Sequence, residues 1–74
     1  MQLTLEVEQE TDGRWLAEVL DLPGVLVYGS TADAAAAAAK ALSLRVLADR
    51  IEHGELAPAD LDSVSFVQRE PLAV

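Results

Sequence analysis

Hydrophobic and polar residues alternate along the start of the chain, MQLTLEVE. Leu3, Leu5 and Val7 point to one side of an extended backbone, and threonine and glutamate side chains point to the other. This period of two predicts a half-buried strand over residues 2–8. The Asp-Gly step at residues 12–13 then predicts a hairpin turn, because glycine accepts the positive φ that tight turns need.

Two further strands are predicted before the chain changes its periodicity. Residues 14–20, RWLAEVL, alternate again, with Trp15 and Ala17 on the same face. The Leu-Pro-Gly step at residues 22–24 interrupts the ladder, because proline has no N–H to donate and glycine permits a sharp bend. Residues 25–28 follow as a third short strand.

A long helix is predicted from about residue 32 to residue 53. Ser30 or Thr31 can cap its first turn, and Ser30 also has capping-box spacing with Asp33. Gly54 suits the position just after the helix, where a left-handed backbone is common.

The apolar residues of this helix fall into two stripes. At 100° per residue, one stripe is made of Ala37, Ala41, Leu44, Leu47, Ala48 and Ile51. Leu42 and Val46 fall nearly opposite, beside Ala35 and Ala39. One stripe must pack on the sheet, and the other needs a cover. We therefore predict a subunit or partner interface at Leu42 and Val46, with partial cover by the C-terminal segment as the alternative.

The end of the chain predicts a loop over residues 55–62 and a fourth strand over residues 63–68. Val64 and Phe66 share one face of that strand. The REPLAV tail that ends the chain is expected to fray.

The resulting element order, β-β-β-α-β, predicts an α+β fold in two layers, with a mostly antiparallel sheet and one long helix on one face. The first three strands form an antiparallel meander, and the crossover helix brings the fourth strand parallel to the first and beside it. The other sheet face stays uncovered within one chain. The sheet register decides whether that face carries Trp15 or Leu16, and it invites a partner.

Composition narrows the classes of protein that remain. A chain of 74 residues is at most one domain, and it buries only about 60% of its unfolded surface. It has no cysteine for a disulfide, so we expect self-association to supply stability, as a homo-oligomer. The net charge of −8 argues against direct nucleic-acid binding and suits a basic partner, although it also serves solubility. The acidic N-terminus is unlike a signal peptide, and no apolar run approaches the length of a membrane span, so we expect a cytoplasmic protein.

The order of motifs in DGRWLAEVLDLPGVLVYGSTADAA resembles the N-terminal domain of HicB-like antitoxins from bacterial type II toxin–antitoxin pairs. In that family a strand ending in Asp-Gly precedes an aromatic residue, then Leu-Pro-Gly, a short strand, a glycine and a helix-opening threonine. The matching positions here are Asp12, Gly13, Trp15, Leu22, Pro23, Gly24, Gly29 and Thr31. The resemblance covers roughly residues 2–53, and ALSLRVLADRIEHGE also looks like a short stand-alone subgroup of the family.

The resemblance implies a partial ribonuclease-H-like fold that forms dimers or tetramers. It also implies a cognate toxin, a small basic HicA-like ribonuclease of double-stranded-RNA-binding fold, which is neutralised by direct binding. Many relatives carry a C-terminal DNA-binding domain. This chain stops shortly after the fourth strand, so we expect a single domain over residues 1–74 with no DNA-binding domain and no autoregulation through DNA.

Candidate catalytic groups are sparse. A ribonuclease-H-type site needs several carboxylates that converge on magnesium, whereas the acids of the first strand, Glu6 and Glu8, lack matching acids on the fourth strand. His53 is the only histidine, and a place near the helix C-terminus explains it. Capping explains the Ser-Thr pair at residues 30–31 better than nucleophilic catalysis does. We expect no catalytic residue, metal or cofactor, and no enzyme.

We therefore predict an antitoxin-type protein that binds a basic toxin with its acidic sheet face. Glu6, Glu8, Glu18 and Asp21 would supply charge complementarity, and Leu22 or Tyr28 would serve as an anchor. The alternative is an orphan homo-oligomeric module without a toxin partner, whose working contact is Leu42 with Val46, or an edge strand.

Overall fold

The structure is a computed structural model that describes residues 1–69. The described residues form four strands, one α-helix and one short 3-10 helix. In chain order these are β1 (Gln2–Gln9), β2 (Trp15–Val19), β3 (Leu26–Gly29), α1 (Ala32–Glu52), η1 (Pro58–Leu61) and β4 (Ser65–Arg69). The predicted α+β fold and its β-β-β-α-β order are confirmed.

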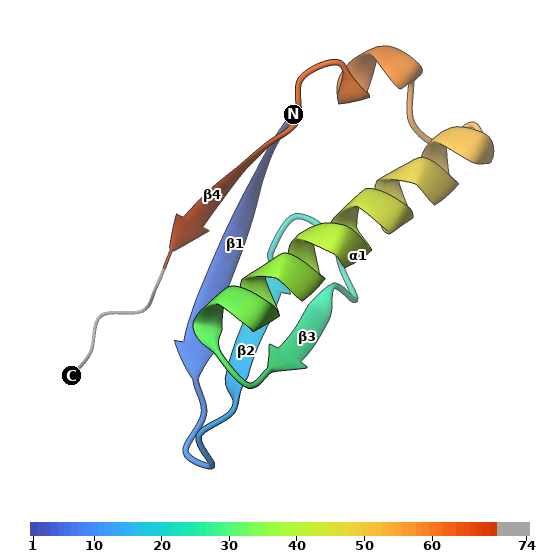
Figure 1. Cartoon of the computed structure of the whole chain (residues 1–74). Coiled ribbons are helices and arrows are strands. Elements are labelled where there is room, and N and C mark those ends of the chain that lie inside the picture. The colour runs from blue at the N-terminus through green and yellow to red at the C-terminus, as the bar shows by residue number, and fades with distance from the viewer. Residues whose placement is uncertain (70–74) are drawn as a thin grey trace.

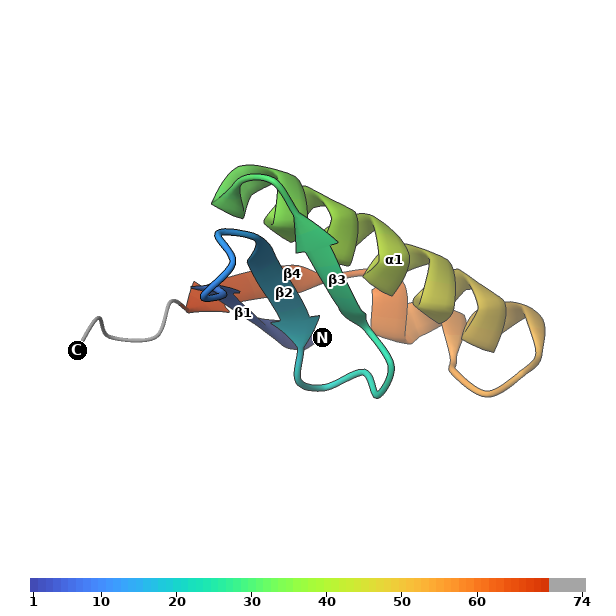
Figure 2. The same ribbon diagram turned by 90° about the horizontal axis from the view of Figure 1, so that it is seen from below.

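The sheet has the strand order β3-β2-β1-β4 (Figure 1). Its first three strands are antiparallel, and β4 runs parallel to β1, as the crossover helix predicted. Figure 2 shows α1 on one side of the sheet, with no other described element on the opposite side. The protein therefore has two layers, and one face of its sheet lacks a cover within the described residues.

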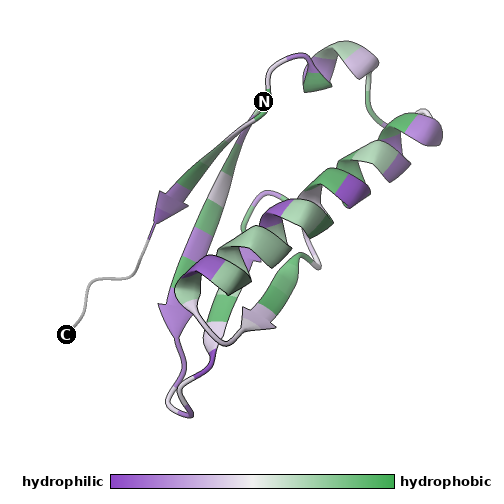
Figure 3. Ribbon diagram, in the orientation of Figure 1, coloured by the Kyte–Doolittle hydropathy of each residue, from purple (hydrophilic) through white to green (hydrophobic). Residues whose placement is uncertain are grey.

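The sheet face toward α1 carries the core. Leu5 lies opposite Val19, and Val7 lies opposite Ala17, and all four side chains are buried. Figure 3 shows the alternation of hydrophobic and hydrophilic residues along β1. The same register places Trp15 on the core side, half-buried, which settles the question that the sequence left open.

The Leu-Pro-Gly step makes the turn between β2 and β3. The N–H of Val25 donates to the carbonyl oxygen of Leu22 at 3.1 Å, and Gly24 has a φ of 90°. This is the pattern of a type II turn, in which proline presets the first central position and glycine supplies the positive φ at the second. The turn also buries both of its end residues, since Leu22 is 3% exposed and Val25 is 2% exposed.

The helix packs on the sheet with the stripe that contains Ala35 and Ala39, and not with the stripe of Ala37, Ala41 and Leu44. Its buried residues are Ala35, Ala36, Ala39, Ser43 and Leu47. Leu42 and Val46 are half-buried and pack against the same core. They are therefore not the uncovered stripe that the interface prediction assumed, and that placement is corrected. The uncovered positions are instead Ala37, Ala41, Leu44 and Ala48. A run of alanines has little contrast between its faces, so the sequence pattern did not identify the buried one.

Both ends of α1 are closed by local hydrogen bonds. The hydroxyl oxygen of Thr31 accepts from the N–H of Ala34 at 3.0 Å, so Thr31 is the N-cap and Ser30 is not. At the other end Gly54 has a φ of 72°. The N–H of Gly54 donates to the carbonyl oxygen of Ile51 at 3.1 Å, and the N–H of Glu55 donates to the carbonyl oxygen of Arg50 at 2.8 Å. This pair of bonds is a Schellman motif. It ends the helix at Glu52, one residue before the predicted end.

The close approach of α1 to β3 depends on Gly29. A Cβ placed on Gly29 would lie 2.5 Å from the backbone nitrogen of Ala35 and 2.9 Å from its Cα. The glycine is therefore required by space, because no side chain fits between the strand and the first turn of the helix. The alanines at this end of α1 extend the same close contact along the helix.

The segment after the helix closes the open end of the core. Leu56, Leu61, Val64 and Phe66 pack against the buried residues, and η1 forms where a loop was predicted. The fourth strand begins at Ser65, two residues later than predicted. Residues 70–74, which include most of the tail predicted to fray, lie outside the described residues.

Thr31→Ala is expected to lower the free energy of unfolding by about 1 kcal/mol, because the N–H of Ala34 loses its acceptor. Ser30→Ala is the matched control and should change it by less than about 0.5 kcal/mol. Urea denaturation followed by circular dichroism measures both. Equal losses in the two variants would contradict the assignment of Thr31 as the cap.

Gly29→Ala is expected to lower the free energy of unfolding by about 3 kcal/mol, because the added methyl group meets helix backbone that cannot rotate away. Gly13→Ala is a suitable control, since its Cβ would meet nothing within 4 Å and only the positive φ is strained. That strain costs about 1 kcal/mol. If the Gly29 variant proves the more stable of the two in urea, the close approach does not limit packing.

Candidate functional site

The candidate site is the sheet face turned away from α1, which we call the open face. Alternation and register place a row of facing side chains across it, with Glu18 between Leu26 of β3 and Glu6 of β1. In the next row Leu16 lies between Tyr28 and Glu8. The open face comprises Thr4, Glu6, Glu8, Leu16, Glu18, Leu26, Tyr28, Val67 and Arg69, together with Leu20, whose N–H donates to the carbonyl oxygen of Thr4 just after β2 ends.

Large apolar side chains lie exposed on the open face. Leu20 is 47% exposed, Leu26 and Tyr28 are each 46% exposed, and Val67 is 41% exposed. Leu16 lies between these positions and is half-buried. Exposed apolar side chains gathered on one face beside charged groups are typical of a surface that binds another protein.

Carboxylates crowd the middle of the open face. Glu6 and Glu18 lie directly opposite each other on adjacent strands, an arrangement that destabilises the sheet by like-charge repulsion. Arg69 of β4 forms an ion pair with Glu6 and relieves part of this repulsion. Neither Glu8 nor Glu18 has an ion-pair partner among residues 1–69. These two carboxylates are therefore available to a cation from outside the chain.

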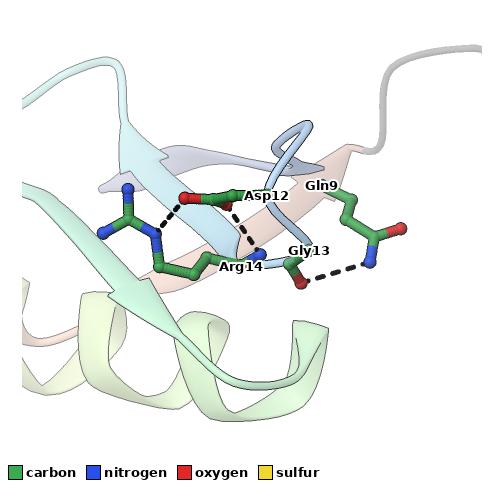
Figure 4. Close-up of polar contacts among 4 residues, drawn as sticks. All are labelled: Gln9, Asp12, Gly13 and Arg14. Atoms are coloured by element: carbon green, nitrogen blue, oxygen red, sulfur yellow. Dashed lines mark hydrogen bonds and ion pairs between the residues drawn. The ribbon is translucent and has the colours of Figure 1, made fainter.

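A compact cluster of hydrogen-bonded residues lies at the β1–β2 hairpin, at one edge of the open face (Figure 4). The backbone N–H of Arg14 donates to Asp12 Oδ1 at 3.0 Å, and Arg14 Nε donates to Asp12 Oδ2 at 2.8 Å. The guanidinium carbon of Arg14 lies 4.3 Å from the centre of the Tyr28 ring. Gln9 Nε2 donates to the carbonyl oxygen of Gly13 at 3.2 Å and steadies the same turn. Asp12 thus orients Arg14, and Arg14 covers one face of Tyr28.

The hydrogen bonds of this cluster lower the pKa of the Asp12 carboxyl below its usual value of 3.8. The backbone N–H of Arg14 is the largest cause, and the Arg14 side chain adds a hydrogen bond and its positive charge. A carboxyl with a lowered pKa in the folded state stabilises the fold at a pH above its unfolded pKa. That contribution is lost as the pH falls through the lower, folded value.

The structure brings most of the predicted partner-binding residues together. Glu6, Glu8, Glu18 and Tyr28 share the open face. Asp21 lies where β2 ends, and its Oδ2 accepts from the N–H of Thr4 at 2.6 Å. The Asp21 carboxylate thus takes the place of a backbone carbonyl as the acceptor for the N–H of Thr4, at the point where the chain leaves β2.

Leu22 does not serve as an anchor, and that part of the prediction is wrong. Its side chain is buried in the chain's own core, because the type II turn folds it beneath α1. The sequence also did not identify Arg14 as part of the site. An arginine directly after Asp-Gly was the available signal, but its contact with Tyr28 depends on how β2 and β3 pair.

Groups suited to chemistry are not gathered on this face. Within residues 1–69, no group of three or more histidine, cysteine, aspartate or glutamate residues could hold a metal ion. His53 lies at the C-terminal end of α1, where Nδ1 is 2.8 Å from the carbonyl oxygen of Asp49. No helix in the described part of the chain is long and apolar enough to cross a membrane. The open face offers carboxylates, an oriented tyrosine and apolar area, which are means of binding.

Comparison with known proteins found no matching family model, no matching curated protein and no matching solved structure. The resemblance to HicB-like antitoxins therefore rests on the sequence motifs described above.

Arg14→Ala is expected to raise the pKa of Asp12 while leaving it below 3.8, because the backbone N–H of residue 14 remains in place. Arg14→Lys should give the Asp12 carboxyl a pKa between those in the wild type and in the alanine variant. Lysine keeps the positive charge but cannot reproduce the hydrogen bond from the planar guanidinium. NMR titration of the side-chain carboxyl carbon measures each value. A pKa at or above 3.8 in the alanine variant would show that the backbone bond is not the main cause.

Proposed function

We propose that this chain is an antitoxin-type protein that binds and neutralises a small basic ribonuclease of the HicA-like kind through the open face. The observation that carries the proposal is a sheet face that no described element covers, on which exposed apolar side chains lie beside two carboxylates, Glu8 and Glu18, that have no ion-pair partner within residues 1–69. The order of motifs from Asp12 to Thr31 supports the same class of partner.

Charge supports a basic partner. The chain carries 13 acidic residues against 5 basic ones. On the open face, an arginine or lysine of the partner placed near Glu18 would relieve the repulsion between Glu18 and Glu6. Binding therefore offsets a repulsion that the free protein retains. Electrostatic complementarity of this kind raises the association rate and selects among partners.

Tyr28 supplies the anchor. Its ring is nearly half exposed, and the Arg14 guanidinium covers one of its faces. Buried aromatic residues often dominate the binding energy of an interface. Because Asp12 and Arg14 already restrict the ring in the free protein, less conformational entropy is lost when a partner buries it.

Neutralisation follows from competition for one surface. A ribonuclease holds RNA with basic side chains that contact phosphates. The acidic open face would bind those same side chains and exclude the RNA from them. This mode of inhibition requires no catalytic group on the chain, in line with an inhibitor that acts by occupying the basic surface.

The test is a pull-down from native lysate with the wild type, Glu8→Lys/Glu18→Lys and Glu52→Lys/Glu55→Lys in parallel. The two double variants change the net charge equally, but the second lies at the far end of α1. We expect the wild type and the helix-end variant to recover a small basic protein that the open-face variant loses. The affinity of the open-face variant should fall at least about tenfold, most clearly at low salt.

The recovered protein is then purified and tested for RNA cleavage. Cleavage should stop when an equimolar amount of the wild-type chain is added and should continue with the open-face variant. Recovery that does not depend on the open-face carboxylates would contradict the proposed surface. A recovered protein that cleaves no RNA, or cleaves it equally well when bound, would contradict the proposed function.

A further inference from the structure

We propose that Glu18 is the centre of a guanidinium-binding site on the open face, so that the basic partner is recognised through an arginine and not through a lysine. This inference rests on the proposed function, because it names the side chain of the partner that the open face takes. It concerns one carboxylate and its apolar neighbours, and it can be tested with simple peptides.

Glu18 lies among apolar side chains in the middle of the open face. It faces Leu26 across the β2–β3 ladder, and Leu16 and Leu20 are the next open-face positions before and after it along the chain. Glu18 is half-buried, on an inner strand of the sheet. A carboxylate beside apolar groups attracts a cation more strongly than one surrounded by water, because the local dielectric constant is lower. Glu18 is therefore placed to hold a single cation.

The cation for Glu18 has to come from another molecule. The sequence has five lysine and arginine residues, and none of them is in the last five residues, EPLAV. Arg14 forms an ion pair with Asp12, and Arg69 forms one with Glu6. The single histidine follows α1, and the remaining basic residues lie on α1 itself, across the sheet from the open face (Figure 2). These are Lys40, Arg45 and Arg50.

The surroundings of Glu18 favour a guanidinium over an ammonium group. A guanidinium is planar, and its N–H donors form a fork that carboxylate oxygens can accept in pairs. Glu6 lies directly opposite Glu18 on β1, so a second carboxylate is close to the same fork. A guanidinium is also more weakly hydrated than an ammonium group, so it loses less when it lies flat on Leu16 and Leu26. Arginine therefore suits both the charge and the apolar surface.

Arg69 shows this kind of pairing within the chain. Its guanidinium forms an ion pair with Glu6 across the β1–β4 ladder, on the same face of the sheet. Arg69, Glu6, Glu18 and Leu26 make one row of facing residues across the four strands. A partner arginine at Glu18 would repeat the pair one strand further along this row. It would also offset the repulsion between the two glutamates.

The test compares hexa-arginine with hexa-lysine, two peptides of equal charge, by isothermal titration calorimetry at low salt. The wild type should bind hexa-arginine at least about fivefold more tightly than hexa-lysine. Glu18→Gln should reduce this preference to less than about twofold. Glu52→Gln removes the same charge at the exposed end of α1 and should keep the wild-type preference. Because Glu18→Gln removes a repulsion with Glu6, it should unfold in urea no earlier than the wild type.

A second pair of variants separates the apolar contact from the charge. Leu26 and Val67 are both exposed on outer strands, at 46% and 41%, but only Leu26 faces Glu18. Leu26→Ala should weaken hexa-arginine binding about threefold, because apolar surface beneath the guanidinium is lost. It should leave hexa-lysine binding unchanged, and Val67→Ala should leave the binding of both peptides unchanged.

Equal binding of the two peptides by the wild type overturns the proposal. A preference that survives Glu18→Gln, or that Glu52→Gln abolishes, overturns it as well. Such a result is separate from the fate of the proposed function. If the arginine preference is absent but the pull-down recovers a ribonuclease, only the guanidinium site is wrong. If the preference depends on Glu18 but no ribonuclease is recovered, only the antitoxin function is wrong.

Discussion

The contact between β3 and the first turn of α1 is the constraint on which the rest of the structure depends. Gly29 lets the backbone of the strand meet the backbone of the helix, with no side chain between them. Once the helix starts this close to the sheet, only alanine-sized groups fit beneath its N-terminal half, and Ala35, Ala36 and Ala39 are buried there. The long run of alanines is thus a packing requirement as well as a source of helix propensity.

This close packing has a consequence for the size of the core. Within residues 1–69, four of the eleven buried apolar residues are alanines, which bury little area each. The larger side chains of the core come from β1 and from the turn after β2, and Leu47 covers them from the helix. A single thin helix layer is enough to cover one sheet face. It leaves the opposite face of the sheet without a cover within residues 1–69.

The open face has a charge pattern that suits a basic protein. Within residues 1–69, Glu8 and Glu18 have no ion-pair partner, whereas Glu6 pairs with Arg69. Glu6 and Glu18 still lie directly opposite each other, so a cation from outside the chain would relieve a repulsion that the free protein retains.

The sequence by itself determined the elements and much of their order in space. Alternation identified β1 and β2, glycine and proline identified the turns, and a crossover helix implied that β4 joins β1 in parallel. These features depend on local sterics and on periods that can be read along the chain. The same reasoning placed Glu6, Glu8 and Glu18 on an acidic sheet face, because alternate residues of a strand share a side.

Only the tertiary structure decided which surfaces are free. The buried stripe of α1 was ambiguous because alanine is nearly neutral between core and solvent, so the position of the sheet selected Ala39 and Leu47 over Ala41 and Leu44. Leu22 looked exposed in a turn, but the type II geometry directs it inward. The contact of Arg14 with Tyr28 joins two strands through their register. Such contacts depend on distances between segments far apart in the chain, which no local pattern contains.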